Sequence, residues 1–136
     1  ALFDPSIFHD IVMIGMGPDA QIEDSDILYL LRKDGALLNA KGEVLRENVV
    51  RLFPQNIRCY RTLALLANGE LVSAVGQKSY GILESSEDVI TVQDIGYGVY
   101  ALKKDGSFQA VWYDKGDINQ VEEAERMAQV TDCKTT

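Results

Sequence analysis

One turn signal occurs three times in this chain, and it restricts the fold more than any other feature. The three residue pairs, each standing between two apolar runs, are Asp34-Gly35, Asn68-Gly69 and Asp105-Gly106. Asp-Gly and Asn-Gly pairs in this setting are the strongest short-range signal for a β-hairpin, because both residues tolerate positive φ. Three hairpins are therefore predicted, and the chain should be mainly β.

The apolar runs beside these turns have matching positions. A leucine stands three residues before each Asp or Asn, at Leu31, Leu65 and Leu102. A further strand-like run precedes each hairpin, directly after Asp10, Asn48 and Asp88. These starting points are 38 and 40 residues apart, so the chain is an internal repeat of small antiparallel units.

We expect a single domain over residues 1–136, with units at approximately 10–47, 48–87 and 88–124 and a partial unit at 125–136. Two segments allow a helix instead of a strand. Residues 118–128 follow an N-capping Asp117 and have apolar residues at helical spacing, which predicts a short C-terminal helix that competes with the partial unit. Residues 43–53 are too few for periodicity to separate a helix from a strand.

The second unit resembles the repeat of a known family. Its runs are Asn48-Val49-Val50-Arg51-Leu52, Arg61-Thr62-Leu63-Ala64-Leu65, Asn68-Gly69-Glu70-Leu71-Val72 and Gly76-Gln77-Lys78-Ser79-Tyr80-Gly81-Ile82-Leu83. In order and spacing these runs resemble the repeat of the regulator of chromosome condensation family. The match is close only over residues 48–83. Arg61, Val75 and Ile82 stand where that family has His, Trp and Gln.

The resemblance implies four-stranded blades of a β-propeller and a role in protein binding through loop faces. Propellers close with about four to eight blades, so three units would make an incomplete ring with two exposed sheet edges. Two architectures remain open. One is a propeller that is incomplete or assembled from copies, and the other is a compact α+β or barrel-like single domain.

Charge and hydropathy exclude two classes of partner. The net charge of −8 should repel phosphate backbones, so nucleic acid is not expected as a partner. The longest apolar runs have five residues and cannot cross a bilayer, so no membrane association is expected. A protein partner or self-association remains.

The candidate binding residues lie in predicted loops. Tyr60 and Tyr97 occupy equivalent loops of the second and third units, and loop aromatics often anchor interfaces. Tyr100 and Trp112 fall on predicted strands, where they should pack in the core or between units. The remaining candidates, acidic residues of the long loop in the first unit that would attract a basic partner, are Glu23, Asp24 and Asp26.

No catalytic or metal-binding motif accompanies these residues. His9 is the only histidine, and no motif typical of a catalytic nucleophile occurs. Cys59 and Cys133 have no metal-ligand spacing, and the sequence leaves open whether they pair. We therefore expect a non-enzymatic protein-binding or regulatory domain without a cofactor or metal.

The alternative function is a small enzyme or ligand-binding α+β domain, with a site near His9, the acidic loop and Cys59. For localisation, Ala1 is compatible with a Met removed in the cytosol and with a cleaved signal. Our expectation is a cytoplasmic protein, with an extracellular one left open.

Overall fold

The computed structural model describes residues 4–16, 28–55, 62–74, 76, 78–95 and 98–113. Within these ranges the chain forms three antiparallel sheets of four, four and three strands and contains no α-helix. In the same part of the chain, no helix is long and apolar enough to cross a membrane. The expected mainly β class is therefore confirmed.

Each sheet is a meander whose strands follow chain order. Unit 1 contains β1 (Ile11–Met16), β2 (Leu28–Arg32), β3 (Leu37–Leu38) and β4 (Val44–Arg46). Unit 2 contains β5 (Val49–Phe53), β6 (Leu63–Leu66), β7 (Glu70–Ser73) and β8 (Ser79–Ile82). Unit 3 contains β9 (Val89–Asp94), β10 (Gly98–Lys103) and β11 (Phe108–Tyr113). Two short 3₁₀ segments precede units 1 and 3, namely η1 (Pro5–Ile7) and η3 (Ser86–Asp88).

The hairpin turns stand where the sequence places them. Each turn has three residues, which are the Asp/Asn-Gly pair and the residue before it. In unit 1 the Arg32 N–H donates to the Ala36 carbonyl and the Gly35 N–H donates to the Arg32 carbonyl, both at 2.9 Å. Only the glycine has a positive φ, which is +97° at Gly35, +91° at Gly69 and +89° at Gly106. The Asp or Asn of each pair does not have a positive φ.

The Asp or Asn before each turn glycine acts through its side chain instead. Its Oδ1 accepts the backbone N–H two residues further on, at 3.2 Å in unit 1 and 2.9 Å in units 2 and 3. Short polar side chains that bond the nearby backbone favour turns over extended strands. The same residue types thus recur because the same turn recurs.

The first strand of every unit is also tied to its hairpin in one way. The carbonyls of Asp10, Asn48 and Asp88 each accept a 2.8 Å hydrogen bond from the residue that opens the turn. Each first strand also has a β-bulge two residues after this Asp or Asn, at Val12, Val50 and Ile90. The three units therefore share turns, links and irregularities, which confirms the predicted repeat.

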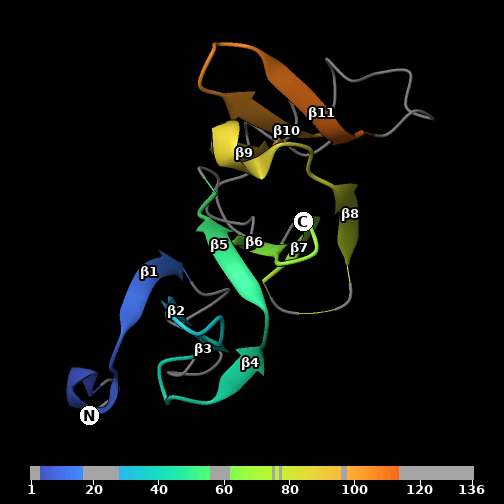
Figure 1. Ribbon diagram of the computed structural model, residues 1–136. Coiled ribbons are helices and arrows are strands. Elements are labelled where there is room, and N and C mark those ends of the chain that lie inside the picture. Colours follow the sequence, from blue (N-terminus) through green and yellow to red (C-terminus); the bar gives the residue numbers. More distant parts are fainter. Residues whose placement is uncertain are drawn as a thin grey trace.

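The sheets follow one another in chain order, from β1 near the N-terminus to β11 at the opposite end (Figure 1). Neighbouring sheets meet along their first strands, with β1 beside β5 and β5 beside β9. The described strands do not close a ring, as expected. Residues 43–53, which the sequence allows as a helix, form β4 and β5. The predicted helix at 118–128 and partial unit at 125–136 lie outside the described residues.

Candidate binding surface

Each sheet has two sides because successive side chains of a strand point in opposite directions. We call the side toward the following unit the front face and the other side the back face. The front face contains a cross-strand pair placed three residues before and after the turn Asp or Asn. These pairs are Leu31/Leu37 in unit 1, Leu65/Leu71 in unit 2 and Leu102/Phe108 in unit 3.

The front face of unit 1 is covered by the back face of unit 2. The buried residues that make up this junction are Tyr29, Leu31 and Leu37 from unit 1 and Val49, Leu52, Ala64, Val72 and Ala74 from unit 2. Arg46, from β4, also donates to the carbonyls of Ala74 at 3.3 Å and Gly76 at 2.5 Å. Apolar burial and an arginine together join the two units.

The front face of unit 2 is covered by the back face of unit 3 in the same way. The buried residues of this junction are Phe53, Leu63, Leu65, Leu71, Tyr80 and Leu83 from unit 2 and Val89, Val92, Val99 and Ala101 from unit 3. Trp112 packs edge-on against Tyr80, with 6.3 Å between ring centres, so the packing between units expected for this tryptophan is confirmed.

Two polar side chains of unit 2 strengthen this second junction. Arg51 donates to the carbonyl of Val89 at 2.7 Å and to that of Ile90, the bulge residue, at 2.8 Å. The Gln55 side chain donates to the Val92 carbonyl at 3.1 Å and accepts the Asp94 N–H at 2.6 Å. Arg51 on β5 and Gln55, two residues after β5, therefore both reach to β9 of the next unit.

The front face of unit 3 is exposed. Leu102 is 39% exposed and Phe108 is 70% exposed, whereas Leu65 and Leu71 at the same positions of unit 2 are 2% and 0% exposed. The Tyr100 and Phe108 rings meet edge to face, with centroids 6.2 Å apart. A Cβ at Gly98 would stand 2.7 Å from the Tyr100 ring, so that glycine allows the ring to lie against the backbone. Tyr100, Leu102 and Phe108 form one apolar surface, which we call the open front face.

The open front face differs from the covered ones in its polar groups. The positions that hold Arg51 and Gln55 in unit 2 hold Thr91 and Ile95 in unit 3, counting from Asn48 and Asp88. Neither can reach across a junction as a guanidinium or a long amide does. A molecule that covered this face would therefore be held mainly by apolar contact.

The back face of unit 1 is partly open at the other end of the molecule. Ile14 corresponds to Leu52 and Val92, since each pairs with the residue four before the turn Asp or Asn. Ile14 is 64% exposed, whereas Leu52 and Val92 are 1% and 0% exposed. Beside it, Leu30 and Leu38 are buried, and Phe8 packs against them. The N-terminal segment thus covers one part of this face and leaves Ile14 accessible.

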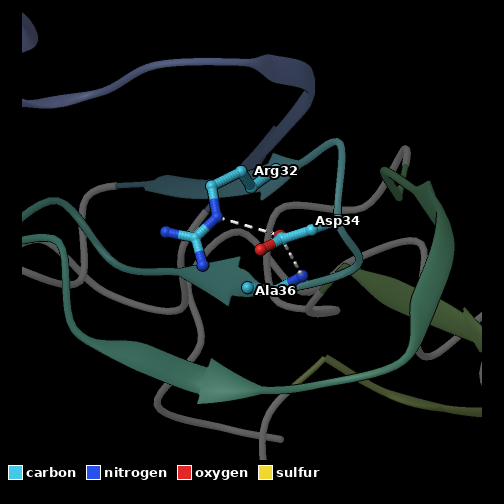
Figure 2. A network of polar contacts seen from close by, with 3 residues as sticks. All are labelled: Arg32, Asp34 and Ala36. Atoms are coloured by element: carbon cyan, nitrogen blue, oxygen red, sulfur yellow. Dashed lines mark hydrogen bonds and ion pairs between the residues drawn. The ribbon is translucent and has the colours of Figure 1, made fainter.

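A surface groove of about 310 Å³ lies where the turn of unit 1 meets the start of β5. Its lining includes Val12 and Val50, two of the bulge residues, together with Arg32 and Asp34. Figure 2 shows that Arg32 Nε and the Ala36 N–H both donate to the Asp34 carboxylate, at 2.9 Å and 3.2 Å. The hydrogen bond from Arg32 lowers the pKa of Asp34, and the charge of the arginine is balanced by this carboxylate. The groove is therefore a poor site for an anion.

None of the binding residues predicted from the sequence can be placed. Tyr60, Tyr97, Glu23, Asp24 and Asp26 lie outside the described residues, as do Cys59 and Cys133. The loop-binding hypothesis therefore stays a prediction. The sequence analysis also missed the open front face, although the spacing of its residues from the turn would have identified the equivalent positions.

His9 is exposed and precedes β1. In the described ranges, no three His, Cys, Asp or Glu side chains come together in a way that could hold a metal ion. The acidic loop and Cys59, the other parts of the alternative enzyme site, are among the residues that the structure does not describe. That hypothesis is accordingly untested.

Comparison of the chain with protein-family models, with curated proteins and with solved structures returned no match. The resemblance to the regulator of chromosome condensation repeat therefore stays a prediction from the residues of unit 2.

Proposed function

We propose that this chain is a non-enzymatic protein-binding domain that holds a partner on the open front face. The observation that carries the proposal is the contrast between equivalent positions. Leu65 and Leu71 are buried under a neighbouring unit, while Leu102 and Phe108 are exposed beside the half-buried Tyr100. Clustered apolar and aromatic side chains on a surface are typical of protein interfaces, where they anchor the partner.

The chemistry of this face favours a protein over other ligands. It presents two aromatic rings in edge contact beside a leucine, and aromatic side chains are common anchors of protein interfaces. The net charge of −8 disfavours nucleic acid. Protein binding also agrees with what the resemblance to the regulator of chromosome condensation family implies.

Site-specific photo-crosslinking tests the proposal. A photoreactive amino acid is placed at Phe108 in one variant and at Ile82 in another, and both are irradiated in extract of the source cells and as purified protein. Ile82 is a matched control because it is 60% exposed but belongs to β8 of the middle unit. We expect a discrete intermolecular protein adduct from position 108 and none from position 82.

Two results would contradict the proposed function. One is the absence of any intermolecular adduct from position 108, including the case in which the only product is a crosslink within the chain. The other is an identical set of adducts from positions 108 and 82, since that would show general exposure rather than a binding face.

A further inference from the structure

The exposed front face of unit 3 and the partly exposed back face of unit 1 are the two kinds of surface that pack together inside the molecule. Both internal junctions are made by the front face of one unit and the back face of the next. The open front face ends the series on one side, and the back face with Ile14 ends it on the other. Among the described residues, both covered front faces are covered by a back face.

The residues at the two ends fit this pairing. On each covered back face the first strand contributes two branched aliphatic side chains, Val49 or Val89 first, and the second of the two is Leu52 in unit 2 and Val92 in unit 3. Ile14 occupies that position in unit 1, has a similar volume, and is 64% exposed. On the opposite side, Leu102 and Phe108 stand where unit 2 has Leu65 and Leu71, which lie in one buried cluster with Val92. An Ile14 side chain set against Leu102 and Phe108 would reproduce the contact inside the molecule.

We propose that two copies of this chain join head to tail, with the open front face of each covered by the back face of unit 1 of the other. This inference rests on the proposed function and identifies the partner as a second copy. The described parts of two copies contribute six units, which lies within the range of about four to eight at which repeated blades close into a ring. Closure also explains why head-to-tail contacts need not extend into a filament.

The N-terminal segment is compatible with this arrangement. Units inside the molecule meet along their first strands, where β1 lies beside β5 and β5 beside β9, and units 2 and 3 also meet where β8 lies beside β11. Phe8 packs over Leu30 and Leu38, on β2 and β3, and leaves Ile14 on β1 exposed. The contact between copies would therefore run along β1 and the front side of unit 3, beside the segment that precedes β1.

Light scattering on the chain of 136 residues and three variants tests the arrangement. The variants are Phe108→Asp at the front face, Ile14→Asp at the back face and Ile82→Asp as the matched control. We expect wild type and Ile82→Asp to have twice the 15.1 kDa mass of one chain. Phe108→Asp and Ile14→Asp should each show half that mass, because in either variant both contacts of the ring contain a buried carboxylate. Circular dichroism confirms that each variant is folded.

Mixing the two monomeric variants gives the decisive measurement. One of the two contacts in a mixed pair is then formed by unaltered faces, so a two-chain species should reappear in the mixture and in neither variant alone. A monomeric wild type would overturn the inference. If Phe108→Asp dissociates the dimer and Ile14→Asp does not, two front faces meet symmetrically and the head-to-tail arrangement is wrong.

These results separate the inference from the proposed function. A monomeric wild type that still crosslinks from position 108 to a different protein would overturn the second copy as partner and keep protein binding. The absence of any intermolecular adduct would overturn both.

Discussion

The front faces of units 2 and 3 are built from the same positions, yet one lies inside the molecule and the other on its surface. Leu65 and Leu102 are the same residue at the same distance from the turn, and they are 2% and 39% exposed. Residue type therefore does not decide burial here. The presence of a following unit does, as expected for repeat architectures in which each unit buries its apolar side against its neighbour.

Truncating both leucines to alanine is the strongest test of this difference in burial. We expect Leu65→Ala to lower the free energy of unfolding by about 2–5 kcal/mol, because it leaves a cavity in the second junction. Leu102→Ala should change it by less than about 1 kcal/mol, as is usual for surface substitutions. Urea denaturation measures both values, at a dilution where light scattering shows single chains.

Measuring the same two variants at rising protein concentration tests whether copies associate through the open front face. If copies join at the open front face, the cost of Leu102→Ala should grow with concentration while that of Leu65→Ala should not, because only the former loses contacts between chains. Equal costs for the two variants at high dilution would contradict the comparison, since they would place Leu102 under cover within the single chain.

The turn glycines allow a second, smaller comparison between the same units. Gly69 and Gly106 have φ near +90°, a conformation that valine adopts only with strain. We expect Gly69→Val and Gly106→Val each to cost about 1–3 kcal/mol in urea denaturation. An added Cβ at Gly69 would stand 3.7 Å from Ile82 and one at Gly106 meets nothing within 4 Å, so packing is not the cause. An unchanged unfolding midpoint for either variant would refute the turn geometry.

The smallest expected effect concerns the turn carboxylates of units 1 and 3. The Arg32 hydrogen bond, followed by the Ala36 N–H, lowers the pKa of Asp34, and the Ser107 hydroxyl and N–H lower the pKa of Asp105. Because the ionised form is favoured in the folded chain, each contribution is present above the ordinary pKa of 3.8 and is lost as the pH falls through the lower folded value.

We therefore expect the Tm of wild type to fall on acidification below pH 3.8, and Asp34→Asn and Asp105→Asn each to reduce that dependence slightly. Both carboxylates are exposed, so solvent screening keeps the effect small. Unit 2 provides the natural control, because Asn68 already occupies this position without a titratable group. Thermal melts on either side of pH 3.8 measure the difference. A steeper pH dependence in either variant would contradict the prediction.

Much of the fold could be predicted from local signals. The three turns were found because glycine is needed for the positive φ and because Asp or Asn bonds the backbone beside it. The starts of the first strands followed from the matching Asp10, Asn48 and Asp88. The turn type was not predicted, because a two-residue and a three-residue turn use the same residue pair and only the hydrogen bonds separate them.

The candidate surface could not be predicted in the same way. Which side of a strand faces a neighbour depends on how the sheets stack, and the bulges at Val12, Val50 and Ile90 change the side on which later residues point. The predicted binding residues were consequently placed in loops and not on a sheet face. Phe108 is not distinguishable by type from a core residue, and its exposure follows from its position in the last described unit.

The two junctions around unit 2 have a consequence for the order in which the chain opens. Unit 2 contributes one face to each junction, so its central strand β6 cannot separate unless both neighbours also separate. In the single chain, units 1 and 3 as described each detach by losing a single junction. Amide hydrogens of β6 should therefore exchange with solvent only through global unfolding, while those of β1 and β11 exchange through cheaper local opening. Amide exchange should therefore be slowest in unit 2, and unfolding should begin in units 1 and 3.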